Sequence, residues 1–515
     1  MAKKAPIIKP KLVIAGPGAG KTHNMVDGII KALGEIHSNR YIAVITYTNS
    51  ATNNIKTRLA KRIAIPENLF IGTMHSFINR FIVIPYASVV LDKIGQEKIF
   101  MQCGTDDVFE LVKKKNGKDY DNKAVAIMKA KIKDKLNEKG MITFDQTIAL
   151  ARECMGAEYV RRIISNRLQF LFIDEFQDTS NGIAEIIEHI RKQGKTEIYC
   201  VGDPEQYIQS FDSSVKVFGN IPILKLAANS RYDVEFNQAN RRCSIPIITF
   251  LNKFNGRTFN GNKFEQKIDN SFEGPPVFFI NKPQHIKDML PVFNSECNKL
   301  AINTRERYVI GKKKDVIRRI SAALDNHYVS PEKNSRQSLL GAVKDTLLST
   351  LQLNQGQFCE THKCDVFHLR KICIAIIKAI RDGVISNQDT FGKFLLETYD
   401  LKVNAALPVM IENFQVMVSE ADSKEYMTVS TIHTIKGLEA DAVLAIAKTE
   451  AELLLWLETD HSIRDAYRDG EKTDYPRLGY VAFSRARKLL GIACLERISA
   501  ETIQQLEELG VSVIT

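Results

Sequence analysis

Several short apolar runs in this chain end in glycine or in acidic residues, and each is followed by a helical pattern of polar and apolar positions. Residues 11–14 (KLVI), 171–173 (LFI) and 199–201 (YCV) are three such runs. Runs of this kind are typical of buried strands, and strands that alternate with helices form parallel sheets. The pattern therefore predicts an α/β protein in which the ends of these strands meet at one sheet edge, where α/β proteins bind ligands.

The first run continues into a glycine-rich loop, residues 15–22 (AGPGAGKT). Between a strand and a helix, this pattern is typical of a phosphate-binding loop, whose backbone N–H groups surround the phosphates. Lys21 is expected to reach the β and γ phosphates, and Thr22 to bind Mg²⁺. The strict pattern has glycine where Ala15 stands, so this is a looser form, and a plain glycine-rich turn is the alternative. The expected nucleotide-binding residues are Gly16, Gly18, Ala19, Gly20, Lys21 and Thr22.

Acidic residues follow the second run, and a Gly-Asp pair follows the third. Asp174 is expected to bind the metal shell, and Glu175 to orient or deprotonate the attacking water. Alone, two acids after a strand are more typical of a solvated helix start. Beside a phosphate-binding loop, and extended to DEFQD at 174–178, they indicate a nucleotide hydrolase. Gln206, in the segment VGDPEQ at 201–206, is expected to sense the γ phosphate.

Composition and charge set limits on the partners. The 515 residues are 44% hydrophobic and 25% charged, which excludes a disordered, collagenous or coiled-coil chain. The net charge of +11 favours a polyanionic partner, although weakly. The longest nearly apolar run, residues 81–91, is too short to span a bilayer, so no membrane partner is expected. Nine cysteines without regular spacing fit a reduced compartment, and we expect a cytoplasmic protein.

Five possible zinc ligands gather between positions 359 and 373. Their spacing matches no common zinc pair, and the surroundings of Cys373 are apolar, so buried free cysteines are the favoured interpretation. The five residues are Cys359, His362, Cys364, His368 and Cys373.

Eight segments in one order identify a family resemblance. They are GAGKT (18–22), ITYTNSA (45–51), TMHSF (73–77), DEFQD (174–178), VGDPEQ (201–206), NRR (240–242), TIHTIKGLE (431–439) and YVAFSRAR (480–487). In this order they resemble the superfamily 1 helicases of the UvrD/Rep/PcrA group, and they reach across most of the chain. The resemblance implies two RecA-like P-loop domains with parallel sheets, each carrying a mainly helical insertion, and the cofactors ATP and Mg²⁺.

The resemblance also divides the chain. Residues 1–75 and 165–235 are expected to form the first RecA-like domain, and residues 236–310 and 426–515 the second. Residues 76–164 and 311–425 are the helical insertions. The basic face of the first insertion is either a solvated helix surface or a DNA contact. Within the second domain, residues 299–305 are predicted to form a strand.

Further site residues follow from the resemblance alone. Arg242 and Arg485 match arginines that touch the γ phosphate, and we expect them to act in catalysis with Glu175 and Gln206. Gly437 and Glu439 match positions near the phosphates and the ribose. The family's upstream glutamine motif, which reads adenine, has no counterpart here, and Arg241 replaces a tyrosine. Adenine selectivity is therefore open, and Arg241 is a candidate to stack on the base.

The resemblance implies a single-stranded DNA path as well. It assigns DNA contacts to Tyr47, His75, Phe211, Thr431 and His433. Stacking of bases on aromatic rings is worth about 1–3 kcal/mol per base and does not depend on sequence. Core packing is the alternative for Tyr47 and for Phe211.

Two functions remain as hypotheses. The first is an ATP-dependent translocase or helicase that moves 3′ to 5′ on single-stranded or tailed duplex DNA. The second follows from a resemblance to the helicase subunits of Gabija-type antiphage systems. It is a DNA-sensing regulatory ATPase with weak unwinding, which acts beside a nuclease partner. A degenerate DNA-binding protein without hydrolysis is disfavoured, because the phosphate-loop lysine, the acids and the arginines are all present.

Overall fold

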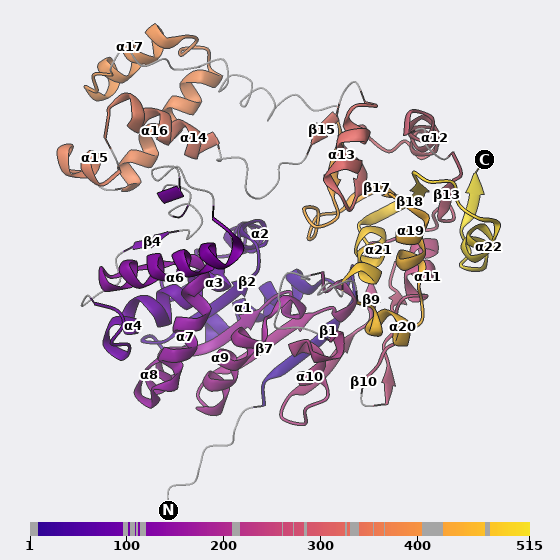
Figure 1. Cartoon of the computed structure of the whole chain (residues 1–515), viewed down its shortest axis with the longest axis horizontal. Coiled ribbons are helices and arrows are strands. Elements are labelled where there is room, and N and C mark those ends of the chain that lie inside the picture. The colour runs from indigo at the N-terminus through magenta and orange to yellow at the C-terminus, as the bar shows by residue number, and fades with distance from the viewer. Residues whose placement is uncertain are drawn as a thin grey trace, which may run out of the picture. The chain divides into compact units, whose positions relative to one another are not determined.

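The computed structural model of the chain describes residues 9–95, 101–103, 109, 112–113, 120–208, 217–259, 261–270, 272–282, 286–324, 327–329, 339–353, 355–364, 366–403, 426–468 and 474–514. The chain divides into two compact units. The first contains residues 1–294 and 435–515, and the second contains residues 295–434. Each unit is described by itself below (Figure 1).

A six-stranded parallel sheet forms the centre of the first unit, in the order β3-β2-β6-β7-β1-β8. The predicted strands at 11–14, 171–173 and 199–201 all lie in this sheet, so these predictions are confirmed. The strands are β1 (Lys11–Ala15), β2 (Tyr41–Thr46), β3 (Leu69–Thr73), β6 (Leu168–Ile173), β7 (Glu197–Gly202) and β8 (Asp233–Asn237).

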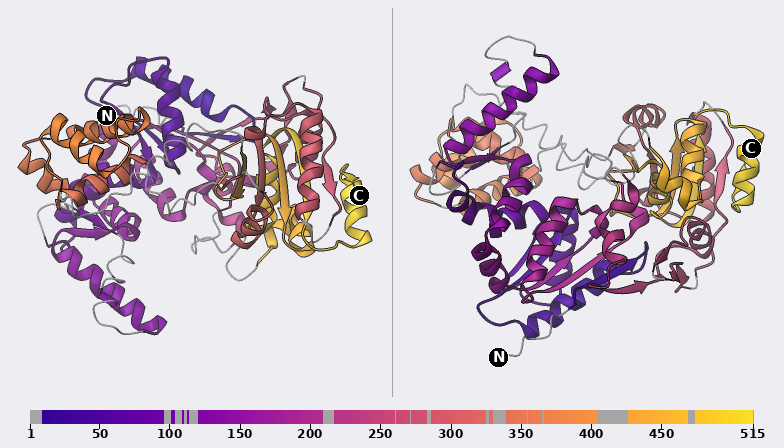
Figure 2. Two further views of the ribbon diagram at one scale, coloured as in Figure 1. Left: turned by 90° about the horizontal axis from the view of Figure 1, so that it is seen from above. Right: turned by 60° about the horizontal axis from the view of Figure 1, so that its bottom comes forward.

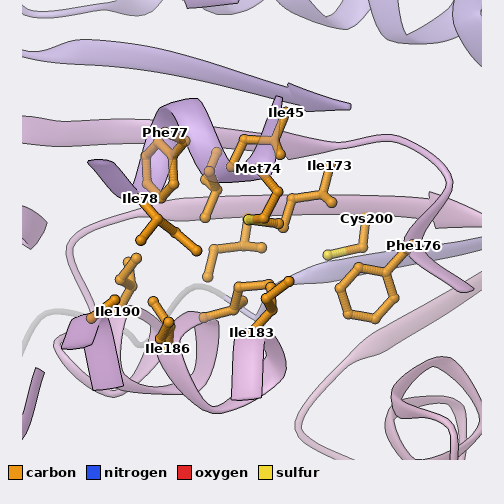
Figure 3. Close-up of a cluster of buried hydrophobic side chains, with 14 of the residues drawn as sticks. Ile45, Met74, Phe77, Ile78, Ile173, Phe176, Ile183, Ile186, Ile190 and Cys200 are labelled. Carbon is orange, nitrogen blue, oxygen red and sulfur yellow. The ribbon is translucent and has the colours of Figure 1, made fainter. Parts of the chain in front are cut away.

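Both faces of this sheet are buried, which explains why its strands are continuous apolar runs. Side chains alternate between the faces: Leu12 and Ile14 of β1 join one hydrophobic cluster, whereas Val13 and Ala15 join the other. The strands β2 and β6 alternate in the same way. Figure 3 shows part of the first cluster, in which Phe77, Phe176 and Ile183 pack together with isoleucines of the sheet.

Helices cover the two faces. Helices α1 (Lys21–Glu35) and α2 (Asn49–Ala60) bury apolar residues in the second cluster, and α9 (Asn181–Lys192) buries isoleucines in the first. The other elements around this sheet are α3 (Met74–Ile78), η1 (Asn79–Val83), α4 (Ile84–Val90), β4 (Met101–Cys103), α6 (Asn122–Glu138), β5 (Met141–Thr143), η2 (Phe144–Gln146), α7 (Thr147–Gly156), α8 (Glu158–Arg167), η3 (Phe176–Asp178), η4 (Pro204–Gln206), η5 (Phe218–Asn220) and α10 (Pro222–Ala227).

The first unit also contains a parallel group of strands in the order β17-β18-β13-β19. Helix α19 lies beside β17, and α21 lies beside β17 and β18. Figure 2 shows this part of the chain as yellow and orange helices next to strands of the same colours. The elements of this part are β9 (Ala239–Asn240), α11 (Ile245–Asn252), β10 (Thr258–Phe259), β11 (Asn262–Lys263), β12 (Lys267–Ile268), β13 (Phe278–Ile280), α12 (Ile286–Lys299), β17 (Ala440–Ala447), α19 (Glu450–Leu457), α20 (His461–Ala466), α21 (Tyr475–Phe483), β18 (Ala486–Cys494), α22 (Ala500–Glu508) and β19 (Ser512–Ile514).

The second unit contains three parallel strands in the order β15-β16-β14 and a group of helices with its own hydrophobic core. Its elements are η6 (Thr304–Glu306), β14 (Arg307–Gly311), α13 (Lys314–Ser321), β15 (His327–Val329), α14 (Leu339–Thr350), α15 (Gln355–Thr361), α16 (Val366–Arg381), α17 (Gln388–Tyr399) and β16 (Met427–Thr431). The α/β class with parallel sheets and helical insertions is as predicted.

The predicted strand at residues 299–305 is wrong. Helix α12 ends at Lys299, and the next residues close its C-terminal turn: Ala301 has a φ of 50°, and the Ile302 N–H donates to the Cys297 carbonyl at 3.0 Å. Such a left-handed residue with back-directed hydrogen bonds terminates a helix. The strand begins only at Arg307, after a short 3₁₀ turn.

Candidate nucleotide-hydrolysis site

The glycine-rich loop lies between the end of β1 and the start of α1, as predicted. Gly18 and Gly20 have φ angles of 72° and 71°, which side chains disfavour. Helices α2 and α9 begin with a capping side chain, Thr48 and Ser180, whereas α1 begins at Gly20 without one. The first N–H groups of this 15-residue helix are thus directed at the loop, where they can donate hydrogen bonds to a bound anion.

Lys21 lies over the same loop. Its Nζ donates to the carbonyls of Ala15 at 3.1 Å and Gly16 at 3.2 Å. Thr22, the predicted metal ligand, lies in the first turn of α1. A cationic side chain and a helix N-terminus at one loop are the chemistry that binds a polyphosphate.

Three amide side chains hold the loop, and the sequence analysis did not identify them. The Gln266 Nε2 donates to the Pro17 carbonyl at 2.7 Å, and the Asn237 Nδ2 donates to the Ala19 carbonyl at 2.8 Å. The buried Asn240 donates to the Gln266 Oε1 at 3.2 Å. Amides far away in the sequence therefore fix the loop that is expected to bind phosphates.

The acidic pair lies at the end of β6 and is buried. Burial and the charge of Glu175 raise the pKa of Asp174, and Lys21 opposes this shift. Burial also acts to raise the pKa of Glu175, but Lys21 and Lys436, together with Gln177 and Arg485, outweigh it, so that this pKa is lowered. Glu175 is thus a carboxylate at neutral pH. Its left-handed φ of 49° is a strained conformation of the kind found at functional sites.

Gln206 and Arg485 meet directly. Gln206 follows β7, and its Oε1 accepts from the Arg485 Nη2 at 2.8 Å, while its Nε2 donates to the Asp203 Oδ2 at 2.8 Å. Burial, together with the charge of Arg242, lowers the pKa of Arg485 to about 10, so it is a cation at neutral pH. The site thus joins a residue of the six-stranded sheet to one that precedes β18.

The remaining predicted nucleotide residues lie near this contact. The Arg242 Nε pairs with the Glu439 Oε2 at 2.5 Å, and Gly437 has a φ of 89°. The backbone N–H of Arg241 donates to the Gly18 carbonyl at 3.1 Å, which places this residue next to the phosphate loop. Its exposed guanidinium pairs with Asp269 at 2.6 Å.

A second ion pair was not predicted, although both partners lie inside recognised segments. The Lys436 Nζ donates to both carboxylate oxygens of Asp178 at 2.7 Å and to the Gln206 carbonyl at 2.8 Å. Both side chains are largely buried. This lysine connects the DEFQD segment to the loop that carries Gln206.

The donor set fits a magnesium nucleotide. Mg²⁺ prefers a few oxygen ligands from the protein and takes the rest from phosphates and water. A buried carboxylate at Asp174 and a hydroxyl at Thr22 offer such oxygens beside the phosphate loop. The pKa of Asp174 is raised because burial and Glu175 disfavour its ionised form. A cation beside it would stabilise that ionised form.

The predicted DNA contacts have mixed surroundings. Tyr47 packs against the first hydrophobic cluster, and its hydroxyl lies 2.5 Å from the Thr179 hydroxyl, which favours the core-packing alternative. His75 stacks on Phe144 with ring centroids 4.5 Å apart, and Phe144 is 51% exposed. In the second unit, Thr431 lies at the end of β16 and His433 is exposed. Phe211 lies outside the described residues.

The cysteine-rich segment resembles a packed core more than a metal site. Cys373 is buried among Leu369, Ile372 and Ile376, and burial raises the pKa of its thiol to about 11. The His362 ring lies against the Phe358 ring in a tilted arrangement, with centroids 4.6 Å apart. In the part of the chain that the structure describes, no three His, Cys, Asp or Glu side chains come together as metal ligands.

Comparisons with known proteins now add to this geometry. Residues 3–212 match a family model described as an AAA domain. The Gabija protein GajB of Bacillus cereus (strain VD045) is 23% identical over 455 residues, which cover 85% of this chain and 86% of that protein. The ATP-dependent DNA helicase Rep of Buchnera aphidicola (subsp. Schizaphis graminum) is 25% identical over 50% of this chain. The ATP-dependent DNA helicase PcrA of Staphylococcus aureus (strain Mu50) is 23% identical over 39%.

The chain is thus similar to UvrD-like proteins of helicase superfamily 1. The predicted fold class of two RecA-like α/β domains is confirmed, and these similarities support a nucleotide-using enzyme of the helicase type. The chain spans 45% of the Rep sequence and 32% of the PcrA sequence, so their activities are not transferred as findings. None of the described helices is both long and apolar enough to cross a bilayer.

Proposed function

We propose that this protein is an ATP-dependent DNA translocase and helicase that couples hydrolysis of Mg²⁺-ATP to 3′-to-5′ movement on single-stranded DNA. The observation that supports this proposal most strongly is the contact between Gln206 and Arg485 beside Lys21 and Glu175. Residues that follow two different groups of strands contribute to one hydrolysis site. When the two groups of strands move relative to each other, such a site is assembled or separated. A motor needs this relation to link hydrolysis to motion.

Binding of the triphosphate is assigned to the phosphate loop. Lys21 and the N–H groups at the start of α1 hold the β and γ phosphates. Gln266, Asn240 and Asn237 keep the loop in the shape that this requires. Asp174 and Thr22 would hold Mg²⁺, which neutralises part of the phosphate charge when bound. Arg241 remains a candidate to stack on the base.

Hydrolysis is assigned to four side chains around the γ phosphate. Glu175, ionised at neutral pH, orients the attacking water and accepts its proton. Gln206 contacts the γ phosphate, and Arg242 and Arg485 stabilise the charge that develops on its oxygens. A planar guanidinium suits this role better than a lysine, because it presents two parallel donors. Arginine fingers accelerate such reactions by about 10³–10⁵-fold.

The DNA path is assigned to residues at the carboxyl edge of the six-stranded sheet and beyond. The exposed ring of Phe144, stacked on His75, offers a flat apolar surface of the kind that bases stack on. Lys123, Lys131 and Lys135 are exposed on α6 at spacings of eight and four residues, which place them on one helix face. Tyr47, Phe211, Thr431 and His433 remain proposed contacts.

Measurement of ATP hydrolysis with and without single-stranded DNA tests this proposal. We expect DNA to raise the rate, and we expect a duplex with a 3′ tail to be unwound faster than one with a 5′ tail. Faster unwinding of the 5′-tailed duplex would overturn the polarity. A protein that does not hydrolyse ATP would overturn the proposal as a whole. Repetition with GTP shows whether the protein prefers adenine.

A second function is supported by one observation. The alignment with the Gabija protein GajB covers most of both chains, whereas the alignments with Rep and PcrA cover half of this chain or less. This favours a DNA-sensing ATPase subunit that regulates a nuclease in an antiphage complex and unwinds weakly. DNA-stimulated hydrolysis without unwinding, together with co-purification of a nuclease encoded beside it, would favour this function over the first.

A further inference from the structure

Glu205 is a buried carboxylate directly before Gln206, and three arginines surround it. Its Oε1 accepts from the Arg257 Nε at 2.9 Å and Nη2 at 2.8 Å. The Arg464 Nη2 lies 3.0 Å and the Arg477 Nε 3.5 Å from its Oε2. The arginines outweigh the effect of burial and hold the pKa of Glu205 far below its usual value. The carboxylate is therefore charged at any pH at which the protein is active.

The surrounding groups extend this ion cluster. Asp465 accepts from the Arg257 Nη1 at 2.8 Å and also pairs with Arg477. The His461 Nδ1 lies 3.7 Å from the Glu205 Oε1, and burial lowers the pKa of this histidine. Arg464 and Arg477 are fully buried, so their charges depend on these carboxylates.

The cluster connects distant parts of the chain. Glu205 belongs to the turn η4 at the end of β7, in the six-stranded sheet. One partner comes from the segment after α11. The others come from α20 and α21, which lie between β17 and β18 in the sequence. Glu205 therefore makes its ion pairs across the same junction that Gln206 and Arg485 cross.

Helix α21 and the residues after it meet three residues of one loop in succession. Arg477 approaches Glu205, the Tyr480 hydroxyl lies 3.4 Å from the Asp203 Oδ2, and the Arg485 Nη2 donates to Gln206 at 2.8 Å. The first two positions are three residues apart, which places them on one helix face. The Arg485 Nε also donates to the Val481 carbonyl at 3.0 Å, so its side chain is fixed to the end of this helix. The position of Arg485 thus depends on how α21 packs against the loop at residues 203–206.

We propose that Glu205 is a positioning residue for ATP hydrolysis. It holds α20 and α21 against the loop at residues 203–206, so that Arg485 reaches Gln206 and the γ phosphate. This inference rests on the proposed function. Glu205 itself touches no phosphate in this assignment and acts through Arg485. Because catalytic groups must be held within a fraction of an ångström, a shift of about 1 Å in α21 costs about 10²-fold in rate.

Glu205→Gln tests the proposal, because glutamine keeps the shape and removes the charge. We expect kcat for ATP to fall by at least about tenfold, with the KM for ATP changed by less than about threefold, since the phosphate loop is untouched. Glu188→Gln is the matched control. Glu188 also pairs with an arginine, Arg191 at 2.6 Å, but lies on α9 away from the site. We expect its kcat to equal that of the wild type.

A double variant separates positioning from simple stabilisation. If Glu205 acts through Arg485, adding Glu205→Gln to Arg485→Ala lowers kcat no further. An equal further loss in that background, or an unchanged kcat in folded Glu205→Gln, would overturn the inference. If Glu205→Gln does not fold, Arg257→Gln, at the partly exposed edge of the cluster, is judged by the same criterion. An inactive wild type overturns the proposed function itself, whereas an active wild type with an unaffected variant overturns only this inference.

Discussion

Replacement of Gly18 by alanine is expected to disturb the phosphate loop more than the same change at Gly20. Alanine at a φ of 72° costs about 1–2 kcal/mol. A Cβ atom there would also lie 2.2 Å from the Asn240 Oδ1, and real side chains do not approach so closely. The Asn240 amide is fully buried. It accepts from the N–H groups of Arg242 at 3.0 Å and Cys243 at 3.1 Å, so it cannot rotate away without losing both bonds.

The magnitudes follow from these contacts. Loss of two hydrogen bonds adds about 1–3 kcal/mol, for a total of about 2–5 kcal/mol at Gly18. Gly20 has nearly the same φ, but its nearest neighbours would lie 3.9 Å from the added atom, so only the backbone cost of about 1–2 kcal/mol applies. Gly34, near the end of α1, has nothing within 4 Å. Alanine there is expected to stabilise the helix by up to about 1 kcal/mol.

Thermal unfolding without nucleotide is the assay, because an added methyl group in either loop position can also touch a bound phosphate. In a unit of this size, with an unfolding entropy of about 2.1 cal/mol/K per residue, each kcal/mol shifts the midpoint by about 1 °C, so Gly18→Ala lowers it by at least about 2 °C. The expected order of midpoints is Gly34→Ala, Gly20→Ala and then Gly18→Ala. Equal midpoints for the two loop variants would show that Asn240 does not press on the loop, and the amide support described above would have to be abandoned.

Three other predictions concern catalysis and DNA binding. Lys21→Ala or Glu175→Gln is expected to abolish ATP turnover but to leave single-stranded DNA affinity within about twofold, which filter binding can measure; normal turnover by either variant contradicts the assigned roles. Phe144→Ala is expected to weaken DNA binding by about 5- to 150-fold, the loss of about 1–3 kcal/mol of stacking, without change in basal hydrolysis. Tyr159→Ala, at another partly exposed aromatic on α8, is its control, and equal affinities of both variants would remove Phe144 from the DNA path. Affinity for single-stranded DNA is expected to fall with salt at a logarithmic slope of about −0.7 for each phosphate contacted, and a flat response would exclude a basic track.

The strands of the nucleotide site were predictable because local patterns determine them. Residues 11–14 and 171–173 are continuous apolar runs, and the sheet buries both of their faces. The failure at 299–305 is also local in origin. The short apolar run at 300–302 looks like a strand, but Ala301 in the left-handed region closes the helix before it. Sequence patterns do not indicate which residue takes that conformation.

The supports of the site could not be predicted in the same way. Gln266 reaches Pro17 across 249 residues, and Arg464 reaches Glu205 across about half of the chain. No spacing rule connects such pairs, because only the folded sheets bring them together. Lys436 and Asp178 lay inside recognised segments, yet the segments alone did not reveal their pairing.

The alternation of β1, β2 and β6 between two covered faces has a consequence for how this protein can evolve. Each of the buried apolar positions of these strands is committed to one packed layer or the other, so polar replacements there are damaging on both faces of the sheet. The turns at the strand ends carry the reactive groups, and they are held by hydrogen bonds and ion pairs of their own. A randomised library should therefore return apolar residues throughout the middle of the sheet, whereas selection at its tips would act on the polar contacts of the site.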